Sequence, residues 1–231
     1  MRYQLVIFDW DGTLMDSALK IVRCFQAAAK DVSLPIPAAT QVHSIIGLGL
    51  TEAVNALFPD HAHELRYAAL DRYREHFLNL DQTEMPLFTG VVEGLASLSN
   101  RGVQLAVATG KSRRGLDRIL RETQTQDLFS ATRCSDETIS KPHPQMLLEL
   151  LEITGVDPEN AVMVGDTEFD MEMARRANVD PVAVTYGAHD HQRLANHLPV
   201  AYFDTFPEVT DWLLGQDPEH RQPLSKKVET V

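Results

Sequence analysis

Four short polar motifs in the 231-residue chain carry side chains that bind metal ions or phosphate groups. The first is Asp9-Trp10-Asp11-Gly12-Thr13, in which two carboxylates lie two residues apart. The glycine permits a backbone geometry that brings amide groups close to an anion. The same residues are also typical of a strand that ends in an Asx-turn. This motif alone therefore leaves a binding site and a simple turn equally open.

The other three motifs supply a hydroxyl group, a lysine and a second pair of carboxylates. Thr109 and Gly110 precede a predicted helix, whose free N–H groups suit a phosphate. Lys141 stands just before two prolines, and Asp166 and Asp170 lie one helical turn apart. Like charges this close repel each other unless a cation lies between them. Each motif taken singly also fits an ordinary helix cap, a surface lysine or an acidic first turn.

The motifs belong to a pattern of alternating strands and helices. Short apolar runs cover residues 4–8, 103–108, 161–164, 179–184 and 200–203. Segments of helical periodicity lie between them, at 91–98, 112–121, 144–153 and 168–177. This alternation predicts an α/β fold with a Rossmann-like parallel sheet core, in which helices cover both faces. Because ligands bind at the carboxyl ends of such strands, we expect the four motifs to meet at one edge of the sheet.

Residues 16–85 show a different sequence pattern, with helical periodicity and no convincing strand. It interrupts the α/β alternation directly after the first strand. We therefore predict a catalytic core made of residues 1–15 and 86–215, with an all-helical insertion at 16–85, called here the cap segment. Residues 216–231 are polar and contain two prolines, which predicts a poorly ordered tail.

The composition excludes several classes of protein. With 44% hydrophobic residues the chain is globular, and its 21 basic against 33 acidic residues give a net charge of −12. That balance argues against a nucleic-acid partner. No apolar run is long enough to span a membrane, and Asp9 interrupts the only early one. Cys24 and Cys134 lie far apart, which fits free thiols in a reducing compartment. We expect a cytoplasmic protein without a membrane partner.

Several carboxylates, one lysine and one hydroxyl at the ligand edge of a sheet suit one kind of chemistry. Mg²⁺ prefers oxygen ligands and is typically held by one or two carboxylates together with a substrate phosphate. A carboxylate can also attack phosphorus and form an aspartyl-phosphate. The motifs contain neither a serine nor a cysteine in the place of a nucleophile. The combination therefore predicts Mg²⁺-dependent phosphoryl transfer.

The four motifs, complete and in order over residues 3–206, resemble the haloacid dehalogenase superfamily, specifically its phosphatases with a helical cap after the first motif. The resemblance implies that Asp9 is the nucleophile and a Mg²⁺ ligand. Asp11 would be the general acid and base, and its backbone carbonyl would ligate the metal. Thr109 and the Gly110 amide would hold phosphate oxygens. The dehalogenase branch lacks the second aspartate, so Asp11 indicates phosphoryl transfer.

The resemblance also assigns the remaining motif residues. Lys141 would neutralise the nucleophile and the transferring phosphoryl group. Asp166 would be the third protein ligand of Mg²⁺, and Asp170 would support the metal site and Lys141. Trp10 would contribute its backbone amide to the phosphate site, whereas its side chain carries little functional weight. Arg113, at the start of a helix, is a further candidate near the phosphate.

The cap segment contains the sequence Gly47-Leu48-Gly49 just before a predicted helix. It resembles the specificity loop of phosphoglycolate-phosphatase-like caps, in which glycines let the backbone approach a small phosphoester. A plain glycine turn between two helices explains the same residues equally well. We therefore expect Gly47, Leu48 and Gly49 to lie over the substrate when the cap closes.

These observations predict Mg²⁺-dependent hydrolysis of a small phosphorylated metabolite, with a phosphoglycolate-phosphatase-like enzyme as the leading hypothesis. A β-phosphoglucomutase-like mutase and a pyrophosphatase or nucleotidase of the same family stay open. A receiver-type regulatory domain shares clustered aspartates, Thr and Lys, but Asp11 and the long insertion disfavour it. A catalytically silent binding protein is the least favoured hypothesis. Monomer and homodimer are both compatible with the sequence.

Overall fold

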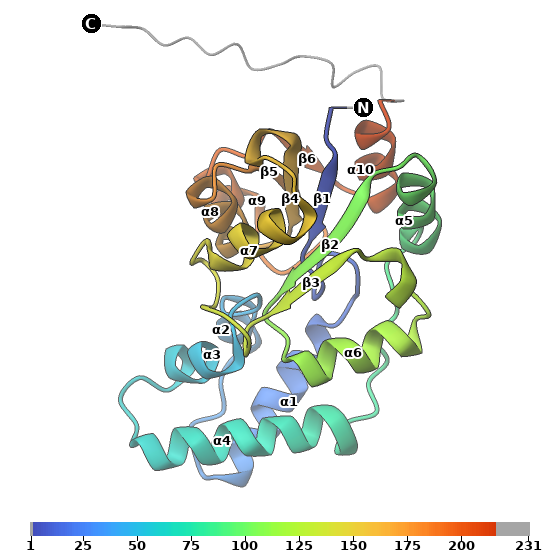
Figure 1. Cartoon of the computed structure of the whole chain (residues 1–231). Coiled ribbons are helices and arrows are strands. Elements are labelled where there is room, and N and C mark those ends of the chain that lie inside the picture. Colours follow the sequence, from blue (N-terminus) through green and yellow to red (C-terminus); the bar gives the residue numbers. More distant parts are fainter. Residues whose placement is uncertain (1, 216–231) are drawn as a thin grey trace, which may run out of the picture.

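A computed structural model describes residues 2–215, and the predicted tail at 216–231 lies outside the described residues. The described residues form a six-stranded sheet in the order β3-β2-β1-β4-β5-β6, in which every neighbouring pair is parallel (Figure 1). The strands are β1 (Leu5–Phe8), β2 (Gln104–Thr109), β3 (Ala131–Cys134), β4 (Ala161–Gly165), β5 (Asp180–Val184) and β6 (Ala201–Phe203). The predicted α/β fold with a Rossmann-like parallel sheet is confirmed.

The edge strand β3 was not predicted from the sequence. Its four residues, Ala-Thr-Arg-Cys, contain two polar side chains and only the last of them is fully buried. A strand at the edge of a sheet packs against one neighbour only, so it does not need the continuous apolar run that marks a central strand. The search for apolar runs therefore missed β3, although it found the five other strands.

Side chains of the central strands alternate between two layers of helices. Leu5 and Ile7 of β1 pack against α7 and α8, whereas Val6 and Phe8 pack against α5, α6 and α10. These helices are α5 (Val91–Asn100), α6 (Arg113–Glu122), α7 (Gln145–Thr154), α8 (Glu168–Arg176) and α10 (Phe206–Leu213). The alternation follows from the two-residue period of a strand, and it makes a three-layer sandwich. The remaining short elements of the core are η2 (Gln126–Leu128), η3 (Pro158–Asn160) and α9 (His191–Ala195).

The cap segment folds into helices that lie together beyond the carboxyl ends of the strands (Figure 1). They are α1 (Ala18–Asp31), α2 (Ala39–His43), α3 (Leu50–Leu57), α4 (His63–Glu75) and the π-helix η1 (His76–Leu80). Their apolar side chains form a hydrophobic cluster whose buried members all lie between Ile21 and Leu70. This separate cluster supports the division into a core and a cap segment, which stays a prediction. No helix of residues 2–215 is long and apolar enough to cross a membrane.

The register of the sheet brings the predicted motifs to one edge. Phe8, the last residue of β1, pairs with Val107 of β2 on one side and with Val164 of β4 on the other. The residues that follow these three strands therefore lie at the same level. Asp9, Thr109 and Asp166 meet there because the strands are parallel and in step.

The two leucines Leu148 and Leu150 of α7 provide a matched test of the packing. Leu150 is fully buried in the cluster beneath the sheet, whereas Leu148 is 44% exposed. Leu150→Ala is expected to lower the free energy of unfolding by about 2 to 5 kcal/mol, because it leaves a cavity. Leu148→Ala should change it by about 0.5 kcal/mol or less. Chemical denaturation measures both, and equal losses would contradict this packing.

Candidate active site

Three buried carboxylates gather at the carboxyl edge of the sheet. Asp9 follows β1, Asp166 follows β4, and Asp170 lies in the first turn of α8. Each of them offers an oxygen within 4.8 Å of the others, and none is more than 1% exposed. Three acidic groups this close together and out of contact with water repel one another strongly. The cluster therefore needs positive charge beside it.

Lys141 supplies part of that charge. Its ammonium group donates to Asp9 Oδ1 at 2.5 Å and to Asp170 Oδ1 at 2.7 Å, and the lysine side chain is fully buried. Lys141 does not lie at the end of a strand, as the sequence pattern suggested. It lies in the loop that follows β3, seven residues beyond Cys134. The loop carries the lysine back over the end of β1.

The pKa values of the cluster reflect burial and mutual repulsion. Burial raises the pKa of Asp9 well above its ordinary value; Lys141 lowers it, and the charges of Asp170 and Asp166 raise it further. Burial and then the charge of Asp170 raise the pKa of Asp166 to about 7. Burial opposes the charge on Lys141, but its ion pairs with Asp170 and Asp9 outweigh that effect and raise its pKa. A single lysine therefore leaves the cluster with an excess of negative charge.

Asp166 is fixed by residues from both ends of the chain. Its Oδ1 accepts a hydrogen bond of 2.8 Å from the Thr13 hydroxyl, and its Oδ2 accepts one of 2.7 Å from the Ala188 amide. Gly12 has a φ of +87°, and a β-carbon there would lie 2.2 Å from Asp166 Oδ2. A side chain at position 12 would therefore collide with this carboxylate. The glycine of the first motif is explained by this close approach.

Asp170 uses both of its oxygens. Oδ1 accepts from Lys141, while Oδ2 accepts from the Thr167 hydroxyl at 2.6 Å and from the Thr167 amide at 3.1 Å. Thr167 in turn accepts from the Asp170 amide, so the two residues form a reciprocal cap at the start of α8. This cap holds Asp170 in place to orient Lys141.

The donor set at this cluster fits Mg²⁺. Asp9 Oδ2 is buried and has no hydrogen-bond partner among the described residues, which leaves a carboxylate oxygen unsatisfied. Asp9 and Asp166 present hard oxygen ligands within 4.8 Å of each other, the type that Mg²⁺ prefers. A divalent cation beside these oxygens would also remove the repulsion that raises their pKa values.

Asp11 points toward a different set of partners. Its Oδ1 lies 2.9 Å from the Lys111 ammonium and accepts a hydrogen bond of 2.6 Å from the Ser17 hydroxyl. The Lys111 ammonium also lies 5.0 Å above the ring of Phe77, in the cap segment. The side chain of Asp11 is therefore separate from the three-carboxylate cluster, so that its predicted link to the metal would involve its backbone carbonyl only.

The phosphate-binding residues predicted around β2 lie at the site, with different environments. Thr109 is fully buried, and its hydroxyl accepts from the Lys111 amide at 3.1 Å, while Gly110 lines the cavity described below. The side chain of Trp10 is buried in the core, where its indole N–H contacts Met15 Sδ at 3.4 Å. The backbone role predicted for Trp10 stays a prediction.

The suggestion that Arg113 lies near the phosphate is wrong. Its guanidinium forms an ion pair of 2.7 Å with Glu137 and another of 3.1 Å with Asp117, and it also donates to the Thr132 hydroxyl. Neither Arg113 nor any of these three partners lines the cavity described below. Glu137 is 24 residues away in sequence, so the spacing along α6 gave no sign of it.

The predicted cap loop, Gly47-Leu48-Gly49, lies directly on the core. The Gly49 amide donates to the buried Ser140 hydroxyl at 2.8 Å, next to Lys141. A β-carbon on Gly110 would lie 2.4 Å from the Leu48 carbonyl oxygen, and one on Gly47 would lie 2.9 Å from Thr167 Oγ1. The backbone of the loop therefore touches the core where only glycine fits. The cap segment is closed over the site.

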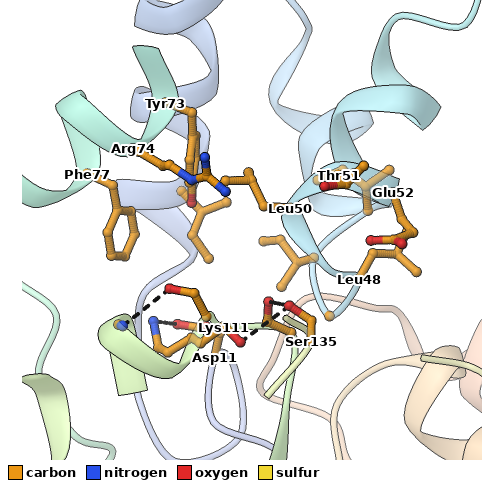
Figure 2. Close-up of a pocket in the computed structure, with 18 of the residues that line it drawn as sticks. Asp11, Leu48, Leu50, Thr51, Glu52, Tyr73, Arg74, Phe77, Lys111 and Ser135 are labelled. Atoms are coloured by element: carbon orange, nitrogen blue, oxygen red, sulfur yellow. Dashed lines mark hydrogen bonds and ion pairs between the residues drawn. The ribbon is translucent and has the colours of Figure 1, made fainter. Parts of the chain in front are cut away.

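Between the core and the closed cap segment lies a cavity of about 210 Å³. Its floor includes Asp9, Asp11, Lys111 and Ser135, and its walls and roof come from the cap segment. Figure 2 shows Asp11, Lys111 and Ser135 on one side, facing side chains that project from α3 and α4. The candidate nucleophile and the candidate acid thus face the same small cavity.

Three polar contacts of the site were not predicted from the sequence: Thr13 on Asp166, Lys111 on Asp11, and Ser140 under the cap loop. Thr13 and Ser140 belong to the motifs, and this position was the sign in the sequence that they could contribute to the site. The partners are 153, about 100 and 91 residues away. Pairs at such separations are made by the tertiary fold.

Residues 6–184 match the family model described as "Haloacid dehalogenase-like hydrolase". The chain belongs to this family. It is a phosphatase of the family, and the alternatives of a receiver-type regulatory domain and a silent binding protein are not supported. The matched range includes the motifs that contain Asp9, Thr109, Lys141 and Asp166.

Relatives of this phosphatase cover most of its length. "Probable phosphatase IndB" of Dickeya dadantii is 36% identical over 89% of this chain and 91% of that protein. The N-acetylmuramic acid 6-phosphate phosphatase of Pseudomonas aeruginosa is 32% identical over 81% of this chain and 84% of its own. A crystal structure of a predicted phosphoglycolate phosphatase from Haemophilus somnus 129pt gives a TM-score of 0.82 at 26% identity, covering 94% and 99% of the two chains.

The contact between Gly110 and the cap loop is tested by Gly110→Ala. Its β-carbon would force the Leu48 carbonyl away, so the loop would lose its closed position. Hydrogen exchange of the Gly49 amide should become faster, and kcat/KM should fall by about tenfold to a hundredfold.

Gly115→Ala is the matched control, because a β-carbon at that position in α6 meets only Ser112 Oγ, at 3.3 Å. This variant should keep the protection of the Gly49 amide. Unchanged exchange and kinetics in Gly110→Ala would show that the loop does not depend on this close approach.

Proposed function

We propose that this enzyme hydrolyses a small phosphomonoester through an aspartyl-phosphate formed on Asp9, with Mg²⁺ as its cofactor. The observation that carries the proposal is the arrangement of Asp9. One of its oxygens is held by Lys141, the other is buried without a partner among the described residues, and the residue lines the cavity. A carboxylate in this position is oriented and poorly solvated, as a nucleophile should be.

In the first step, an oxygen of Asp9 attacks phosphorus while the bond to the leaving oxygen breaks. Asp11 lines the same cavity and is the acid that would give its proton to the leaving alkoxide. In the second step, Asp11 would take a proton from water, which attacks the aspartyl-phosphate and releases phosphate. The contacts with Lys111 and Ser17 orient the Asp11 side chain. Asp11 would carry a proton at the start of the first step and would be a carboxylate when it accepts the proton from water.

The positive charge that this reaction needs comes from two sources. Lys141 opposes the rise that burial causes in the pKa of Asp9, and it places a fixed cation beside the phosphoryl group, whose oxygens carry the negative charge of the transition state. Asp9 and Asp166, together with the Asp11 carbonyl, would hold Mg²⁺, which supplies further charge stabilisation to the phosphoryl oxygens when bound. Thr109 and the Gly110 amide complete the proposed phosphate site.

The size of the cavity favours a small substrate. Its volume of about 210 Å³ lies below the range of roughly 300 to 1,000 Å³ that is usual for drug-sized ligands. The relatives named above have different substrates in their names, so membership of the family does not determine which leaving group the enzyme accepts. Within these limits a phosphoglycolate-phosphatase-like activity is the finer proposal.

The nucleophile is tested with Asp9→Asn in a phosphatase assay over a panel of metabolite phosphates. With Mg²⁺, the wild type should release phosphate from at least one ester, and a chelator should abolish this activity. Asp9→Asn should lower kcat/KM by about a thousandfold or more, because the amide is a poor nucleophile.

Asp60→Asn, at an exposed position of the cap segment, is the control and should stay within about twofold of the wild type. Substantial hydrolysis by Asp9→Asn would show that Asp9 is not the nucleophile. Full activity of the wild type in excess chelator would show that the reaction does not need Mg²⁺.

A further inference from the structure

Two consecutive residues of α4, Tyr73 and Arg74, project into the cavity from the side opposite the catalytic floor. Figure 2 shows both side chains on α4, across the cavity from Asp11, Lys111 and Ser135. The reaction described above uses neither of them. Their polar ends face the part of the cavity that the leaving group of a phosphoester would occupy.

Tyr73 is a fixed side chain with a free hydroxyl group. Its ring lies 4.2 Å from that of Phe25 and is stacked on that of Phe77 at 5.6 Å. The hydroxyl makes no hydrogen bond to any described residue. Burial, followed by the nearby Cys24 and Asp11, raises the pKa of Tyr73 well above its ordinary value. The hydroxyl group is therefore a neutral donor, held in position, that a ligand can satisfy.

Arg74 is a cation with a weak partner. Its guanidinium lies 3.3 Å from Asp71, three residues earlier on the same helix, and the two side chains are 56% and 73% exposed. Ion pairs of this kind contribute little, because both groups are well hydrated. The guanidinium can leave Asp71 at small cost and bind an anion in the cavity.

The acidic residues that line the cavity are Asp9, Asp11, Glu52 and Asp136, and the last accepts a hydrogen bond of 2.8 Å from the Arg113 amide. Asp9 is paired with Lys141, and Asp11 with Lys111. Glu52 lies in the first turn of α3, where the free N–H groups of a helix favour an acid. Of the two cations among the described residues that line the cavity, Arg74 has the weaker pairing, because Lys111 is buried against Asp11 at 2.9 Å whereas Arg74 is exposed and lies 3.3 Å from Asp71. The apolar side chains of Leu48, Leu50 and Phe77 lie between it and the floor.

We propose that Tyr73 and Arg74 form a leaving-group subsite that binds a carboxylate on the substrate, so that the enzyme selects phosphomonoesters of small hydroxy acids. The planar fork of a guanidinium matches a carboxylate, and the Tyr73 hydroxyl adds a third donor. The apolar walls contact the carbon atoms between carboxylate and ester. A carboxylate also fits the small cavity better than a second phosphate group does. This inference rests on the proposed phosphatase function.

The test compares esters that differ only in this group. The pairs are 2-phosphoglycolate with 2-hydroxyethyl phosphate, and 3-phosphoglycerate with glycerol 3-phosphate, in which CH₂OH replaces the carboxylate. The wild type should prefer the carboxylate in at least one pair by about tenfold or more in kcat/KM. Arg74→Met should lose about tenfold to a hundredfold on that carboxylate and about twofold or less on its neutral partner. Tyr73→Phe, which keeps the ring contacts, should show a smaller loss of the same selectivity.

Arg72→Met is the matched control, because Arg72 lies on the same helix but pairs with Asp31 at 2.6 Å, outside the cavity. It should leave the preference unchanged. Equal losses on both members of a pair in Arg74→Met, or a wild type without preference, would overturn the subsite.

Binding separates this inference from the proposed function. The dissociation constant of phosphonoacetate, which carries a carboxylate and is not hydrolysed, is measured by titration calorimetry against that of 2-hydroxyethylphosphonate. Arg74→Met should weaken the binding of phosphonoacetate alone by about tenfold or more. An enzyme that hydrolyses none of the esters but shows this selective loss would contradict the proposed function and support the subsite. Equal binding of both phosphonates by the wild type would contradict the subsite.

Discussion

The buried pairing of Lys141 with Asp9 and Asp170 is the interaction on which the rest of the site depends. A lysine and three carboxylates have been removed from water at the end of a parallel sheet. Such groups are costly to bury unless every charge is compensated. The lysine accounts for one charge, and the unsatisfied oxygen of Asp9 marks where further positive charge belongs. A cation bound at this position would let an acidic protein with a net charge of −12 hold a phosphate.

The close approach of other groups to the backbone at two glycines is the second constraint. The carboxylate of Asp166 occupies the space beside Gly12, and the carbonyl of Leu48 occupies the space beside Gly110. The first contact fixes a proposed metal ligand, and the second brings the cap segment down onto the core. The floor of the cavity is thus built by the sheet, and its roof is built by helices inserted after the first strand. In the proposed function, this division would keep the chemistry in the floor and leave the selection of the leaving group to the roof.

The sequence predicted the floor of the site far better than its roof. Asp9 and Asp166 directly follow strands and Thr109 is the last residue of one, and parallel strands in register must bring their ends together. Lys141 was expected at the same edge, but its route was not, because the polar edge strand β3 has no continuous apolar run. The error on Arg113 and the missed pairing of Lys111 with Asp11 share one cause. Long side chains pair with groups that only the tertiary fold brings near. The positions of Tyr73 and Arg74 at the cavity likewise depend on the tertiary fold.

The most direct test of this account is the thermal unfolding of the wild type with and without Mg²⁺, at ionic strength matched with NaCl. If the buried carboxylates hold the cation, Mg²⁺ at about 100 times its Kd adds about 2.7 kcal/mol of stability and raises the Tm by several degrees. Mg²⁺ should not raise the Tm of the Asp166→Asn variant. A wild-type Tm that is the same in Mg²⁺ and in matched NaCl would contradict the central claim that this cluster is a metal site.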